Sequence, residues 1–196
     1  MKNLVDISLF TLDKHTTSQG YRLLCPITDR VFWSKVVWCR LNIPKHSFMM
    51  WLAVLKRLKT RDRLLRFQVI DNADCLLCSR NIESVDHLFF ECPYSTDCLE
   101  KIKQWLNWSM RTTLLSRIIR WIGKAKISKF KKNLFSAVIA ALVYQIWHNR
   151  NCKLWLSTLE STDVAVLKTK DAVKYRIMCM WPRNVTKRDI DWFNAL

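Results

Sequence analysis

Residues 75–92 read Cys-Leu-Leu-Cys-Ser-Arg-Asn-Ile-Glu-Ser-Val-Asp-His-Leu-Phe-Phe-Glu-Cys. The stretch brings together Cys75, Cys78, His87 and Cys92 in the pattern Cys-x2-Cys-x8-His-x4-Cys. Zinc takes thiolate and imidazole ligands in a tetrahedral shell, and four protein ligands leave no open position. A Cys-x2-Cys turn lets two thiolates converge on one ion, and the histidine and last cysteine close the other side. The pattern therefore predicts a zinc knuckle, residues 75–92, that holds one structural zinc ion.

The His-x4-Cys spacing predicts a local departure from regular helix. Side chains four residues apart share one face of a helix, whereas His87 and Cys92 are one residue further apart. Because Pro93 follows, we expect a helix that ends or loosens around Cys92. Three thiolates and a neutral imidazole give the site a formal charge of −1, which a basic neighbour such as Arg80 can offset.

The remaining cysteines and histidines leave alternatives open. Cys98 is the main rival ligand, but we expect it in the core because it lies six residues past Cys92. The isolated cysteines are expected as apolar filling, and the isolated histidines as surface or core residues: Cys25, Cys39, Cys152, Cys179, His15, His46 and His148. The alternative to a metal site is that Cys75 and Cys78 are ordinary buried thiols, since free Cys is a common core residue.

Charge is distributed unevenly along the chain. The net charge is +17; residues 1–100 hold 14 basic and 11 acidic side chains, against 19 and 5 in residues 101–196. No acidic residue lies between Glu100 and Glu160. This excess predicts attraction to polyanions, chiefly nucleic acid. The alternative is a solvated helical surface with an unbalanced charge.

The first residues and the apolar segments indicate an intracellular protein without a membrane span. The N-terminal stretch lacks the apolar segment and cleavage site of a secretory signal, and intracellular cysteines in clusters more often bind metal than form disulfides. The longest apolar stretch, Leu134 to Trp147, is too short to cross a bilayer. We therefore expect the protein in the nucleus or the cytoplasm, without membrane partners.

The apolar pattern predicts a mainly α fold: a small helical domain with the zinc knuckle, followed by further basic helices. With only two Gly and four Pro, tight turns are scarce, which disfavours a hairpin-rich β fold, although a short hairpin at the knuckle fits the sequence. Gly123 is expected to break a helix, Thr60 to cap one, and Ser95 or Thr96 to cap another. Apolar periodicity predicts helices over 31–41, 45–57, 61–67, from 95 or 96 to about 108, about 112–122, about 127–156, and from 161 or 162 to before Pro182.

Several motifs together resemble the zinc-binding domain downstream of plant LINE-type reverse transcriptases. The resemblance covers about residues 30–107 and is dense there. It rests on Trp38-x5-Pro44-Lys45, Phe48-Met49-Met50-Trp51, Leu58-Lys59-Thr60-Arg61-Asp62-Arg63-Leu64, the Cys75–Cys78 pair, and Glu83 to Pro93 with Asp86-His87-Leu88-Phe89-Phe90. The family's ligand positions fall on Cys75, Cys78, His87 and Cys92, as in the interpretation from spacing alone.

The resemblance also implies a domain organisation. It assigns 1–29 to an entry arm, 30–107 to the reverse-transcriptase-type zinc-binding domain, and 108–196 to a basic helical region. The last resembles the connector before ribonuclease H, because Trp147-His148-Asn149-Arg150-Asn151 is similar to the Trp-x-x-Arg-Asn segment there. One departure is Ser79, where the family often has Gly. A left-handed turn there costs roughly 1 kcal/mol relative to Gly, so a looser knuckle is expected.

These observations favour a protein that is not an enzyme. No pair of aspartates has a polymerase-like setting, and the several carboxylates that a two-metal ribonuclease H site needs are missing from residues 101–159. The favoured hypothesis is a structural zinc module from a retrotransposon-derived protein that binds RNA or DNA. The alternatives are a docking module for reverse transcriptase or ribonuclease H parts of a parent polyprotein, and a remnant without selected activity.

The candidate nucleic-acid contacts lie in the acid-free segment. Lys and Arg contact phosphates without reading bases, and aromatic side chains between them can stack on bases. Trp105, Trp108 and Trp121 are interleaved in this way, but their helical spacing favours core positions. The candidate phosphate contacts are Arg111, Arg117, Arg120, Lys124, Lys126, Lys129, Lys131 and Lys132.

Overall fold

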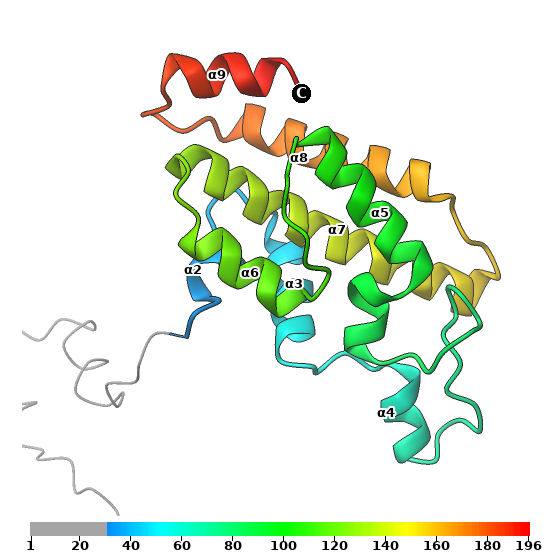
Figure 1. The fold of residues 1–196 in the computed structure, drawn as a ribbon. Coiled ribbons are helices and arrows are strands. Elements are labelled where there is room, and N and C mark those ends of the chain that lie inside the picture. Colours follow the sequence, from blue (N-terminus) through cyan, green and yellow to red (C-terminus); the bar gives the residue numbers. More distant parts are fainter. Residues whose placement is uncertain (1–30) are drawn as a thin grey trace, which may run out of the picture. The chain divides into compact units, whose positions relative to one another are not determined.

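The longest helix, α7 (Lys129–Leu156), is the element around which most of the others pack in the computed structural model, which describes residues 31–196 (Figure 1). The predicted entry arm, 1–29, and with it Cys25 and His15, lies outside the described residues. The remaining elements are α2 (Ser34–Val37), α3 (Pro44–Val54), α4 (Arg61–Arg66), the η2 turn (His87–Glu91), α5 (Pro93–Trp105), α6 (Leu115–Lys124), α8 (Thr162–Cys179) and α9 (Lys187–Asn194).

The core forms along α7 because this helix is apolar on nearly all sides through its middle turns. Residues 134–143 of the helix are all buried, and Leu134, Ile139 and Leu142 are fully so. A helix that is hydrophobic all round is expected inside a protein. It contacts α2, α3, α5, α6, α8 and η2, so helices from both predicted segments, 30–107 and 108–196, share one core. The boundary between those segments stays a prediction.

Side-chain caps fix several helix starts. Ser128 accepts a hydrogen bond from the Lys131 N–H at the start of α7, and Ser161 accepts one from the Val164 N–H at the start of α8. Each such bond satisfies a backbone donor that the first helical turn leaves free. Pro44 occupies the first turn of α3, where its missing N–H costs nothing. These three starts agree with the sequence-based expectation.

Other helix predictions were wrong for local reasons. The helix expected over 31–41 is only α2, because the Asn42 amide donates to the carbonyls of Val36 and Val37 and ends it. Gly123 does not break α6 but lies inside its last turn. The α9 helix was not predicted; it is capped by Thr186, whose hydroxyl accepts from the Asp189 N–H and donates to the Asp189 carboxylate.

No strand forms within residues 31–196, so the fold class is mainly α as predicted and the knuckle hairpin is not confirmed. Only an isolated antiparallel bridge joins Asp74 and Ile82. None of the helices in this described part combines the length and the apolar character that crossing a membrane requires.

Candidate metal centre

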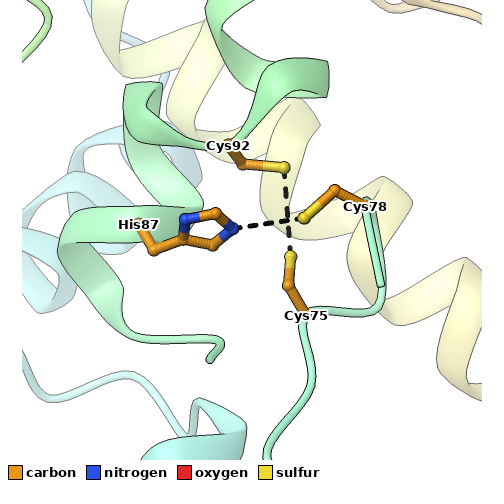
Figure 2. Close-up of side chains that lie close together, drawn as sticks. All are labelled: Cys75, Cys78, His87 and Cys92. Atoms are coloured by element: carbon orange, nitrogen blue, oxygen red, sulfur yellow. Dashed lines mark hydrogen bonds between the residues drawn. The ribbon is translucent and has the colours of Figure 1, made fainter. Parts of the chain in front are cut away.

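The four side chains of the Cys-x2-Cys-x8-His-x4-Cys pattern converge at one point (Figure 2). Their ligand atoms all lie within 4.8 Å of one another; the Cys75 and Cys92 sulfurs are 3.9 Å apart, and Cys78 Sγ is 3.4 Å from His87 Nε2. Tetrahedral zinc with bonds of about 2.3 Å to sulfur and about 2.0 Å to nitrogen separates its ligand atoms by roughly 3.5–3.8 Å. The cluster can therefore hold one metal ion of this size.

The first half of the knuckle is a tight turn stabilised by backbone hydrogen bonds. The Ser79 N–H donates to the Cys75 carbonyl at 2.7 Å, and Ser79 has a φ of 53°. This is the left-handed turn expected at the position where the resembling family often has Gly. The Cys75 N–H donates to the Asn81 carbonyl at 2.7 Å. The turn directs the Cys75 and Cys78 sulfurs to the same side, as a shared ion requires.

The second half of the knuckle is a widened helical turn. The Cys92 N–H donates to the His87 carbonyl at 2.7 Å, five residues back, and Phe89 and Phe90 between them leave helical geometry. Phe90 has a φ of 84°, a left-handed conformation that non-glycine residues rarely adopt. The extra residue in the turn is what brings His87 and Cys92 onto one side. The predicted loosening near Cys92 is thus present.

The strained Phe90 is held by its own backbone contacts. Its N–H donates to Ser95 Oγ at 2.9 Å, and its carbonyl accepts from Thr96 Oγ1 at 3.0 Å. Ser95 and Thr96 were predicted to cap the next helix, which was wrong: α5 begins at Pro93, and the two hydroxyls stabilise the metal-side turn instead. Their contribution explains how a buried phenylalanine keeps a positive φ.

The donor set fits a soft divalent ion such as zinc. Cys75 and Cys92 are 1% and 0% exposed. The hydrogen bond with Cys92 lowers the pKa of the Cys75 thiol to about 5, and the same bond, with burial, raises the pKa of Cys92. Cysteine thiols bind zinc as thiolates, so metal binding here is coupled to proton release. Three sulfurs and one imidazole nitrogen favour zinc over calcium or magnesium, which prefer oxygen.

Within residues 31–196, the other cysteines and histidines do not join the cluster. Cys98 is fully buried in the core, and burial raises the pKa of its thiol to about 12, as suits an apolar filler rather than a thiolate ligand. Cys39 is also buried, but Cys179 is exposed, so the expectation of apolar filling was wrong there. His46 is buried and stacked on Tyr144, with ring centroids 4.5 Å apart.

Comparison with known families bears on the same residues. Residues 15–98 match the family model described as zinc-binding in reverse transcriptase. That stretch is similar to reverse-transcriptase zinc-binding domains. It includes all four converging side chains, and zinc is the metal for which the family is described. No curated protein and no solved structure gives a significant match to the chain.

Most of the predicted phosphate contacts are accessible. Arg111, Arg117, Arg120, Lys124, Lys126 and Lys129 are exposed, whereas Lys131 and Lys132 are half-buried. Lys131 Nζ lies 4.4 Å from the Trp192 ring centroid, and Lys132 Nζ donates to the Gly123 carbonyl at 3.4 Å. Within residues 31–196, none of these eight cations forms an ion pair with a carboxylate. No carboxylate in this described part of the chain therefore neutralises their charges.

The tryptophans between these cations pack inward. Trp108 lies 5.3 Å from Trp121 and 4.7 Å from Phe135, measured between ring centroids, and it is 6% exposed. Trp105 is half-buried, and its indole N–H donates to the Leu196 carbonyl at 2.8 Å. The core interpretation of these side chains thus agrees with their packing.

Two residues that support the centre had no role in the sequence-based prediction. Glu83 and Arg150 form a buried ion pair beside the knuckle, 67 residues apart in sequence. Neither spacing nor composition connects them. The only signal in the sequence was that Glu83 and Arg150 each lie in a motif that resembles the reverse-transcriptase family.

Proposed function

We propose that the chain is a non-catalytic zinc-binding module of a protein derived from a plant LINE-type retrotransposon, and that it contacts nucleic acid through phosphate-directed Lys and Arg. The zinc ion is held by Cys75, Cys78, His87 and Cys92. The observation that carries the proposal is the convergence of these four side chains inside the stretch that matches the zinc-binding family. Four protein ligands leave no position for a reactive water, which favours a structural role.

The zinc ion acts as a clamp on a segment with little regular secondary structure, although its Leu88, Phe89 and Phe90 side chains are buried in the core. Within residues 75–92, the backbone relies on a few turn hydrogen bonds and adopts positive φ at two non-glycine residues, Ser79 and Phe90. Structural zinc supplies folding free energy directly, because the assembled site does not exist in the unfolded chain. Removing the ion is therefore expected to open this segment first.

Chelation tests the clamp. Hydrogen exchange of residues 70–100 should rise strongly when a high-affinity chelator removes the metal, and readdition of zinc should restore protection. Calcium serves as the matched control, because it prefers oxygen ligands and should restore nothing. Unchanged exchange of this segment after complete metal removal would contradict a structural role.

Nucleic-acid contact is supported by the exposed cations of the acid-free segment, whose charges no carboxylate within residues 31–196 neutralises. Six of the eight predicted contacts are exposed: Arg111, Arg117, Arg120, Lys124, Lys126 and Lys129. Each phosphate contact releases a counterion, so affinity should fall steeply with salt. Because the nearby tryptophans pack inward, the contacts read charge rather than base identity.

A charge-matched pair of variants tests this interaction. Replacing Lys124, Lys126 and Lys129 with Gln should lower the slope of log affinity against log salt by about 0.9 for each phosphate of duplex DNA that the variant no longer neutralises. The control replaces the exposed Lys45, Lys59 and Lys187 with Gln, which removes the same charge outside the acid-free segment. Equal slopes for the two variants, or no salt-dependent binding of single- or double-stranded RNA or DNA by the intact chain, would sink the nucleic-acid proposal.

A second candidate function is docking on reverse transcriptase or ribonuclease H parts of a parent polyprotein. The observation that favours it is an exposed aromatic group near the start of the described region: Trp38 and Phe48 are 52% and 48% exposed and both lie against Trp51. Apolar docking of this kind should persist at high salt, whereas phosphate binding should not. Binding of such a polyprotein fragment that is unaffected by salt and abolished in Trp38→Ala would favour this candidate.

A further inference from the structure

A buried ion pair joins the knuckle to the last turns of α7. Arg150 Nε and Nη2 donate to the same carboxylate oxygen of Glu83 at 3.0 and 2.7 Å. The two side chains are 3% and 0% exposed. A buried pair of this kind carries a high desolvation cost and is tolerated where further hydrogen bonds satisfy both groups.

The Glu83 carboxylate also holds the backbone from which two of the proposed zinc ligands project. Its Oε2 accepts from the N–H of Leu76, which lies between Cys75 and Cys78, at 3.3 Å. Its Oε1 accepts from the N–H of Arg61 at the start of α4 at 3.1 Å. One carboxylate thus connects the Cys-x2-Cys turn, α4 and, through Arg150, α7.

The residue before Arg150 reaches the other side of the knuckle. Asn149 is fully buried, and its Nδ2 donates to the Tyr94 hydroxyl at 2.7 Å. Tyr94 lies two residues past Cys92, and its own hydroxyl donates to the Glu160 carbonyl at 3.0 Å. Adjacent side chains of one helix therefore hold both halves of the knuckle, through Glu83 on one side and Tyr94 on the other.

We propose that Arg150 and Asn149 are positioning residues of the metal centre, so that zinc binding and the packing of the last turns of α7 are coupled. This inference rests on the proposed zinc site. Both residues lie outside the stretch 15–98 that matches the zinc-binding family. The residues that support the metal centre therefore extend about fifty residues beyond that stretch. Coupling of this kind is reciprocal: α7 raises zinc affinity, and zinc raises the stability of α7 packing.

Zinc affinity of full-chain variants gives the first test. Arg150→Met keeps the aliphatic length but leaves Glu83 without its partner, and should weaken zinc binding 10- to 100-fold in competition with a chromophoric chelator, as outer-shell changes do. Arg150→Lys keeps the charge but cannot donate from two nitrogens in the same geometry, and should recover part of that affinity. The control is Ser128→Ala, which removes the cap at the opposite end of α7 and should leave zinc affinity unchanged.

Hydrogen exchange of the wild-type chain gives a second test that needs no variant. Chelation of zinc should raise the exchange of residues 145–152 together with that of residues 75–92, while residues 130–138 of the same helix keep their protection. The inference is overturned if Arg150→Met binds zinc within twofold of the wild-type affinity. It is also overturned if the hydrogen exchange of residues 145–152 is the same with and without zinc. In either case a wild-type chain that binds one zinc ion leaves the proposed function standing, whereas a wild-type chain that binds none overturns both.

Discussion

The zinc knuckle and the helical region around α7 share one apolar core but differ in the other forces that stabilise them. Around α7, apolar side chains such as Leu134, Ile139 and Leu142 are fully buried between packed helices. The knuckle contributes Leu88, Phe89 and Phe90 to the same core, but its backbone takes left-handed conformations at Ser79 and Phe90 and also depends on polar contacts and converging metal ligands. A core of many apolar side chains stays folded when one side chain is shortened, whereas a tetrahedral metal centre loses its ion when one of its four ligands is removed. The two regions should therefore respond to different perturbations.

The largest expected effect is the removal of two ligands. In Cys75→Ser/Cys78→Ser, hydrogen exchange of residues 70–100 should approach that of an unfolded chain, because structural zinc contributes on the order of 10 kcal/mol in zinc-finger peptides. The helices α6, α7 and α8 should keep most of their far-ultraviolet circular dichroism. Collapse of all helical signal would show that the two regions do not differ as described.

A large-to-small change in the core should have the opposite selectivity. Leu134→Ala removes a fully buried side chain and should lower the free energy of unfolding by about 2–5 kcal/mol, measured by urea denaturation. Zinc content should stay at that of wild type, because Leu134 lies in the early turns of α7 and the knuckle contacts its last turns. The matched control, Leu156→Ala, affects a side chain that is 65% exposed and should change little.

Acid should weaken the α3–α7 contact through His46. Burial, with the charge of Lys45, lowers the pKa of His46 from 6.5 to about 4. A histidine with a depressed folded-state pKa stabilises the fold fully above its unfolded pKa, and this stability is lost as pH falls from about 6.5 toward 4. His46→Gln should therefore show a shallower loss of stability over this range, measured by urea midpoints at fixed zinc. His148→Gln, at an exposed histidine, is the control and should lose stability with pH as wild type does. The account of His46 is wrong if His46→Gln shows the wild-type pH dependence of stability while His148→Gln does not.

The smallest expected effect is at the Cys-x2-Cys turn. Ser79 has a φ of 53°, so Ser79→Gly should relieve about 1 kcal/mol of strain or less, seen as a modest rise in the midpoint of thermal unfolding at fixed zinc. The control Ser116→Gly lies in α6 with ordinary helical geometry and should be destabilising. A loss of stability in Ser79→Gly would contradict the strain assigned to this turn.

The helices around α7 could be predicted because their signals are local. Apolar spacing predicted α7 over about 127–156, and the start of α8 was predicted at Ser161 or Thr162. The α9 helix was missed although Thr186 and Asp189 carry a local capping pattern, because its short, charged sequence shows little apolar periodicity. Predicted helix bounds were wrong where a side chain outside the helix decides its end. The example is α2, which ends where the Asn42 amide binds its carbonyls.

The candidate site divides in the same way. The four converging side chains were predicted from spacing within 18 residues, and the spacing of His87 and Cys92 predicted the widened turn. The pair Glu83–Arg150 could not be predicted, because 67 residues separate its members and neither residue type implies a partner. Ser95 or Thr96 was predicted to cap a helix, as these residue types often do. Their hydroxyls instead form hydrogen bonds with the backbone of the strained Phe90.

The metal content of the intact chain tests the central claim most directly. After exhaustive dialysis, elemental analysis should give one zinc ion per wild-type chain, one per chain in the matched cysteine control Cys98→Ser, and none in Cys75→Ser/Cys78→Ser. A wild-type chain without zinc, or a double variant that keeps one equivalent, would contradict the assignment of the knuckle as a structural zinc site.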